Sequence, residues 1–78
     1  MSPTVFKYKN YRFFFFSREE KRMHVHVECP EGEAKFWIEP VVALSAHSKL
    51  TDKQLEILKK VVEDRKHEIT KAWLKHFV

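Results

Sequence analysis

The segment Met23–Glu28 alternates apolar and polar side chains at every position. Successive side chains of a strand point to opposite faces, so this pattern predicts a β-strand whose apolar residues enter a core. The polar residues His24, His26 and Glu28 then project together from the other face. Imidazole is the side chain that titrates nearest neutral pH, so this face is the first candidate for chemistry.

A hairpin is predicted before this strand. Residues 4–8 and 11–16 are rich in aromatic and β-branched side chains and flank Lys9–Asn10. This dipeptide favours a two-residue turn, because Asn tolerates a positive φ. The turn sets the following pairs: Tyr8 with Tyr11, Phe6 with Phe13, and Thr4 with Phe15. A charged connection, Ser17–Arg22, then leads into the histidine strand.

A second hairpin joins the histidine strand to a strand over residues 34–39. A two-residue turn on Pro30–Glu31 is disfavoured, because proline cannot adopt the positive φ of a primed turn. A three-residue loop would pair apolar with polar positions, so we expect a four-residue loop over residues 30–33. This loop sets the following pairs: Val27 with Phe36, Val25 with Ile38, Glu28 with Lys35, His26 with Trp37, and His24 with Glu39.

The last third of the chain has helical periodicity. Pro40 should end the ladder, Val41–Leu44 is expected as a further edge strand, and a loop follows over residues 45–48. Thr51 and Gln54 have the spacing of a capping box, which predicts a helix from Asp52 to about His76, bent near residues 64–67.

These elements predict an α+β fold. We expect a small antiparallel sheet of four to five strands in two successive hairpins, followed by one long C-terminal helix. The chain of 78 residues is expected to form a single domain, 1–78, with the sheet in 1–46 and the helix in 51–77.

Size and composition narrow the function classes. A core this small is commonly reinforced, and the single cysteine, Cys29, excludes an intramolecular disulfide and a cysteine-based zinc cage. We therefore expect a homo-oligomer or a protein partner. The lone thiol and the lack of a signal-peptide pattern indicate a cytoplasmic protein, and no stretch is long enough to span a membrane. A formal charge of +4 leaves RNA or DNA contact as a lesser alternative.

Three kinds of chemistry fit the polar face. His24, His26 and Glu28 are candidate metal ligands, but transition-metal sites need three or four well-aimed ligands, so no metal and no cofactor is assigned. His24 and His26 could instead act as base and acid in RNA cleavage, with Lys35 or Arg12 holding the phosphate. Catalysis is therefore an alternative, with His24, His26 and Lys35 as candidate catalytic residues.

Trp37 favours binding over catalysis. In the expected register it lies beside His26 on the polar face, and an exposed tryptophan among cations is typical of a protein interface or of base stacking. Its own alternative is burial under the helix or against Phe14 and Phe16.

Several segments together resemble one known family. They are Pro3–Phe6, Arg12–Ser17, His24–Val27, Ala34–Phe36, and the pair Ile69 and Trp73. In their order they are similar to a family of small bacterial proteins catalogued as a domain of unknown function, number 4160 in that series. The resemblance implies no settled activity; it implies a component of a toxin–antitoxin module, encoded beside a small antitoxin-like protein.

These observations predict a protein-interaction component of such a module, with a homodimer or an antitoxin-like partner covering the polar face. The runner-up is a small metal-independent ribonuclease-like toxin that uses the histidine pair, and a nucleic-acid binder ranks third. The predicted binding residues are Arg12, Phe14, His24, His26, Lys35 and Trp37.

Overall fold

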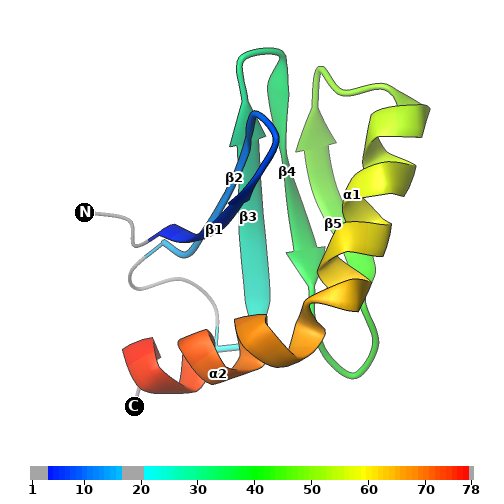
Figure 1. Cartoon of the computed structure of the whole chain (residues 1–78). Coiled ribbons are helices and arrows are strands. Elements are labelled where there is room, and N and C mark those ends of the chain that lie inside the picture. Colours follow the sequence, from blue (N-terminus) through cyan, green and yellow to red (C-terminus); the bar gives the residue numbers. More distant parts are fainter. Residues whose placement is uncertain (1–3, 17–20, 78) are drawn as a thin grey trace.

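Five antiparallel strands follow one another in chain order as neighbours in a single sheet, and two helices complete the chain (Figure 1). The structure is a computed structural model that describes residues 4–16 and 21–77. Residues 17–20, in the predicted charged connection, lie outside the described residues, as do residues 1–3 and 78. The elements are β1 Thr4–Tyr8, β2 Tyr11–Phe14, β3 His24–Cys29, β4 Gly32–Trp37, β5 Ala43–Ser48, α1 Asp52–Asp64 and α2 Lys66–Phe77. The predicted α+β class is confirmed.

The first hairpin has the predicted two-residue turn. Tyr8 pairs with Tyr11, and the positive φ falls on Lys9, at 55°. The register shifts at a bulge in β1, so Thr4 pairs with Phe14. The predicted pairing of Thr4 with Phe15 was wrong, because the bulge adds one residue to β1.

The second hairpin is tighter than predicted. Cys29 pairs with Gly32, so the turn is Pro30–Glu31 and the expected four-residue loop was wrong. Among the described residues, positive φ occurs only at Lys9 and Lys49. The turn on Pro30–Glu31 therefore forms without the backbone angle that proline forbids.

The change of loop length moves β4 by two residues along β3. Every predicted pair across this hairpin changes, but a shift of two keeps each side chain on its predicted face. The observed pairs are His24 with Trp37, Val25 with Phe36, His26 with Lys35, Val27 with Ala34, and Glu28 with Glu33.

Gly32 allows a close backbone approach at the start of β4. A Cβ at this position would collide with the carbonyl oxygen of Ser48 and lie 3.0 Å from the carbonyl carbon of Lys49. The absence of a side chain thus lets the end of β5 pack against the turn.

The fifth strand starts and ends later than predicted. Residues 45–48 were expected as a loop, and β5 instead spans Ala43–Ser48 beside β4. Its sequence is ALSAHS, which lacks β-branched residues and has no clear alternation. A bulge interrupts its pairing with β4 between Lys35 and Phe36. β4 spans Gly32–Trp37, two residues earlier at each end than the strand predicted over residues 34–39, and Pro40 lies outside the ladder as predicted.

The helical tail begins as predicted. Thr51 caps α1: the backbone N–H of Gln54 donates to its Oγ1 at 3.1 Å, and the Thr51 N–H donates to Oε1 of Gln54 at 2.9 Å. Both halves of the capping box are therefore formed.

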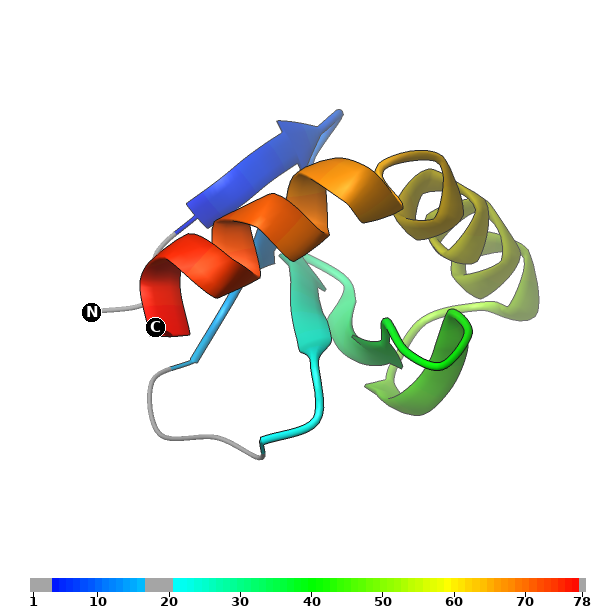
Figure 2. The ribbon, with the colours of Figure 1, turned by 90° about the horizontal axis from the view of Figure 1, so that it is seen from below.

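One long C-terminal helix was predicted, and the structure has two helices instead. They meet at Arg65, within the region where a bend was expected. Arg65 leaves helical geometry, with φ −109° and ψ 20°, and α2 then runs across one end of the sheet (Figures 1 and 2). A helix of 13 residues spans about 20 Å, roughly the length of a six-residue strand. The change of direction lets Ile69 and Trp73 become buried instead of extending past the sheet.

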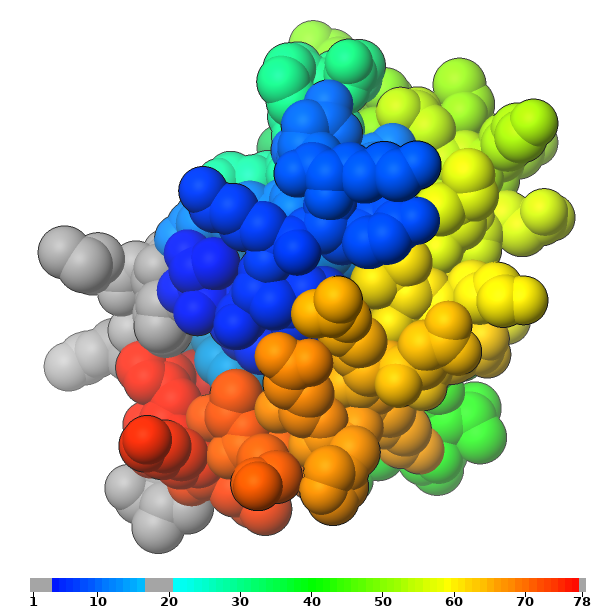
Figure 3. All heavy atoms as spheres, in the orientation of Figure 1, coloured from blue at the N-terminus to red at the C-terminus, as the bar shows by residue number. Residues whose placement is uncertain are grey.

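One face of the sheet and both helices enclose the core. In Figure 3 the first hairpin, α1 and α2 together cover one side of the molecule. The hydroxyl of Tyr11 accepts a hydrogen bond from Nε2 of Gln54, and the guanidinium of Arg65 lies 4.4 Å from the centre of the Phe6 ring. The largest fully buried apolar side chains are Phe13, Phe15, Phe36, Ile38, Leu58, Ile69, Val25, Val27 and Val62.

Candidate functional site

The six predicted binding residues lie on one face of the sheet, opposite the face that forms the core. The pairings of Phe14 with His26, His26 with Lys35, and His24 with Trp37 establish this, because residues directly opposite in a ladder point to the same side. We call this side the open face. We call the line of six residues across it the open-face row: Arg12, Phe14, His26, His24, Trp37 and Lys35.

The row begins with stacked rings on β2 and β3. The guanidinium carbon of Arg12 lies 4.5 Å from the centre of the Phe14 ring. The Phe14 and His26 rings are stacked with their centres 5.5 Å apart. Phe16 meets the same imidazole edge-on at 4.5 Å. Phe14 is only 5% exposed, because these neighbours cover it.

The row continues through the second histidine to the tryptophan. The ring centres of His24 and His26 are 5.1 Å apart, and those of His24 and Trp37 are 5.8 Å apart. Two cations stand over the half-buried indole: the guanidinium carbon of Arg22 at 4.3 Å and the ammonium of Lys35 at 4.5 Å. A cation on an aromatic face is held by the ring's negative quadrupole, which fixes the position of its charge.

The two histidines differ sharply in accessibility. His26 is half-buried, whereas His24 is fully buried. Trp73 from α2 lies 5.2 Å from the His24 ring, at the end of the sheet that α2 crosses. The Nδ1 atom of His24 is 2.8 Å from the carbonyl oxygen of Arg22. A carbonyl can only accept, so Nδ1 carries the proton and donates it in this contact.

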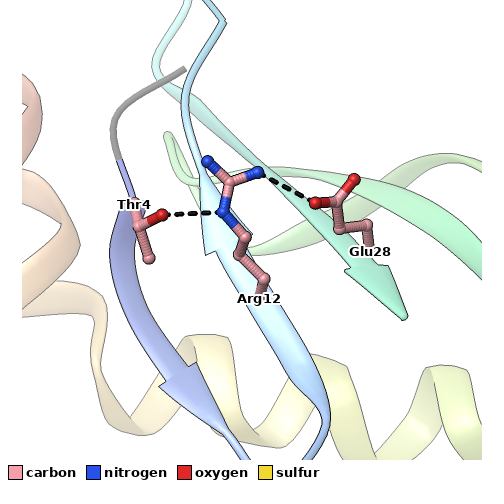
Figure 4. A network of polar contacts seen from close by, with 3 residues as sticks. All are labelled: Thr4, Arg12 and Glu28. Atoms are coloured by element: carbon pink, nitrogen blue, oxygen red, sulfur yellow. Dashed lines mark hydrogen bonds and ion pairs between the residues drawn. The ribbon is translucent and has the colours of Figure 1, made fainter. Parts of the chain in front are cut away.

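The polar end of the row is a small network on three strands (Figure 4). Arg12 donates from Nε to Oγ1 of Thr4 at 2.7 Å and from a terminal nitrogen to Oε2 of Glu28 at 2.9 Å. The network directs the guanidinium along the open face. It also commits Glu28, a candidate metal ligand, to an ion pair.

The structure does not bring the candidate metal ligands His24, His26 and Glu28 together around one point. Within residues 4–16 and 21–77, no group of three or more His, Cys, Asp or Glu side chains is placed to hold a metal ion. His24 is buried among aromatic rings, and Glu28 points to Arg12.

A hollow of about 240 Å³ lies beside the row on the side of β5. Phe16, His26, Lys35 and Glu33 line it, together with Ala46, His47 and Ser48 of β5. The hollow therefore lies between the row and the edge strand β5. A single side chain of a partner would fit there.

The six predicted binding residues leave out two neighbours of the row. Arg22 lies two residues before His24, so extending the alternation of β3 backwards would have placed it on the same face. From the sequence, Phe16 was expected only as possible cover for Trp37, together with Phe14; in the structure it contacts the rings of Phe14 and His26.

The comparisons with known proteins identify a family and no individual relative. Neither the curated proteins nor the solved structures include a match to this chain. In the described chain neither helix is both long enough and apolar enough to cross a lipid bilayer. The family model described as "Domain of unknown function (DUF4160)" matches residues 10–74, which contain β2 to β5, α1 and the whole open-face row. The chain belongs to the DUF4160 family.

Proposed function

We propose that this protein is a protein-interaction component of a small cytoplasmic two-protein module of the toxin–antitoxin kind. Its docking surface is formed by the partly exposed members of the open-face row, Arg12, His26, Lys35 and Trp37. The observation that supports the proposal best is the pair of cations held over Trp37, at 4.3 and 4.5 Å. Tryptophan and arginine are the residues most enriched among those that dominate binding energy at protein interfaces.

The positions of these charges indicate the chemistry of the partner. Arg12 is fixed on Phe14 by two hydrogen bonds, and Arg22 and Lys35 are fixed on Trp37. Cations fixed before binding lose less side-chain entropy when a partner docks. An acidic surface with an apolar or aromatic centre would complement this arrangement of charges and rings.

Burial of one histidine favours binding over catalysis. A general acid and a general base must both come within hydrogen-bonding distance of the substrate. His24 has no exposed surface, and its Nδ1 proton is donated to a backbone carbonyl. Only His26 of the pair has exposed surface on the open face.

The test is co-purification with the product of the neighbouring gene, followed by calorimetric titration. We expect Trp37→Ala to weaken the complex at least about thirtyfold, in the range of interface hot spots. Ile57→Ala is the matched control, because Ile57 is 41% exposed on α1 and lies outside the row. We expect this control to bind within about twofold of the wild type.

The same preparation separates the alternatives. A complex that Trp37→Ala leaves unchanged would refute the proposal. Cleavage of RNA by the wild type that is lost in His26→Gln would favour the ribonuclease. Binding of a single-stranded RNA that weakens with Trp37→Ala, in the absence of any protein complex, would favour the nucleic-acid binder.

A further inference from the structure

The two edges of the sheet differ in how they are protected against pairing with another chain. An edge strand presents backbone N–H and C=O groups on its outer side, and natural proteins commonly block such edges with charged residues, proline or bulges. β1 contains Lys7 within the strand, and a lysine directly follows each edge strand, Lys9 after β1 and Lys49 after β5. β5 has the sequence ALSAHS, with no Lys, Arg, Asp, Glu or Pro.

The unprotected edge is also accessible. Five of the six residues of β5 are exposed, and α1 leaves them uncovered although it follows β5 directly in the chain. Leu44 is 39% exposed, and Val41, just before the strand, is 64% exposed. Apolar exposure at an uncharged sheet edge is typical of a strand that pairs with another strand.

Bulges do not explain the difference between the edges. Both β1 and β5 contain a register shift against their neighbours. In β5 the regular stretch after the shift is Ala46–Ser48, which pairs with β4 from Lys35 to Glu33. Alternate residues of an antiparallel strand direct their backbone groups to opposite neighbours, so part of this stretch faces outward.

We propose that β5 is a self-association edge, at which two copies of this chain pair antiparallel about a two-fold axis. Across such an axis β5 of one copy pairs with β5 of the other, so the two strands have the same length and composition. Because β5 carries no formal charge, self-pairing sets no like charges opposite one another. An acidic partner, in contrast, would find no cation within β5.

Self-pairing would also join the two open faces. The local two-fold axis of an antiparallel pair is perpendicular to the sheet, so both copies present the same face on the same side. The two five-stranded sheets would become one, with both open-face rows on one surface. A chain of 78 residues has a small core, and pairing would add the support that such domains commonly need.

The test is sedimentation equilibrium of the full chain over a range of concentrations. We expect the mass to rise from 9.4 kDa towards twice that value. The dissociation constant should be on the order of micromolar, because a short strand pair buries less than the roughly 1,600 Å² of a standard interface.

Ala46→Glu is the decisive variant. Residue 46 is opposite Lys35, so the new carboxylate has a cation beside it within its own chain and the fold is preserved. In the dimer the same substitution places two carboxylates near the axis, and we expect at least about tenfold weaker association. Lys7→Glu at the other edge is the matched control and should leave association unchanged.

Amide hydrogen exchange gives a second, independent readout. The outward-facing amides of β5 should become more protected as the concentration rises. A single 9.4 kDa species up to about 1 mM, or equal association of wild type and Ala46→Glu, would overturn the inference. Protection of β5 only after the neighbouring gene product is added would assign the edge to a partner strand and would equally overturn self-pairing. Trp37→Ala should leave self-association unchanged, so this result is separable from the docking role of the row.

Discussion

Phe13 and Phe14 are neighbours in β2, are almost equally buried, and lie on opposite faces of the sheet. Phe13 has no exposed surface and stacks on Phe6 with ring centres 4.4 Å apart. Phe14 is 5% exposed, and its cover consists of a guanidinium, an imidazole and a half-exposed phenyl ring. The two residues show that burial alone does not separate the core of this protein from its candidate site.

The core and the candidate site differ in which groups cover the buried aromatic rings. On the helix-covered face, apolar side chains cover one another and exclude water. On the open face, the polar groups of Arg12 and His26 supply part of the cover of Phe14. Long cationic side chains can lie on an apolar surface in this way while their charged ends face solvent. The first arrangement stabilises the fold, and the second is suited to contact a partner.

The largest expected effect compares these two phenylalanines. Phe13→Ala should lower the free energy of unfolding by about 3–5 kcal/mol, because it leaves a cavity in a rigid core. Phe14→Ala should lower it by about 1–2 kcal/mol, because its polar neighbours can relax and be rehydrated. Urea denaturation measures both. Phe13→Leu serves as a milder variant if the alanine variant does not fold, and equal losses at the two positions would contradict the distinction between the faces.

The next effect compares the two histidines. His24→Ala should lower the free energy of unfolding by about 2–4 kcal/mol, since His24 is fully buried between Trp37 and Trp73. His26→Ala should cost less than about 1 kcal/mol of stability and should weaken partner binding. Denaturation and titration of the same two proteins check this pair. If His26→Ala is the more destabilising change, the row is part of the packing and not a docking surface.

The smallest effect concerns the ion pair at the end of the row. A double-mutant cycle on Arg12→Ala and Glu28→Ala should give a coupling free energy below about 1 kcal/mol, because the side chains are 28% and 49% exposed. The coupling should fall further in high salt. A larger coupling would mean that the network stabilises the fold, and Arg12 would then be less suited to contact a partner.

The faces of the sheet could be predicted from the sequence, and the exact partners within it could not. Alternation alone was enough to place four residues on the same face: His24, His26, Lys35 and Trp37. A shift of the register by two residues leaves every side chain on its original face. The register of the second hairpin was missed because the turn at Pro30–Glu31 forms without a positive φ.

The burial of His24 could not be predicted from the pattern of its own strand. It depends on the change of direction at Arg65, which turns α2 across the end of the sheet and brings Trp73 to the imidazole. The periodicity of the helix indicated a weak point near this residue, but not the direction taken after it. The bounds of β5 were misplaced for a simpler reason: an edge strand was expected over residues 41–44, but residues 45–48 are small or polar and have no pattern that distinguishes an exposed edge from a loop.

The two tight hairpin turns also determine where this chain tolerates added residues. Each of the turns at Lys9–Asn10 and Pro30–Glu31 has only two residues, so one extra residue there would exchange the two faces of the following strand unless a bulge absorbed it. The connection between β4 and β5, over residues 38–42, is longer and includes exposed positions at 39–41. A fluorescent label or an epitope tag is best inserted in this connection, where neither face of the sheet needs to change.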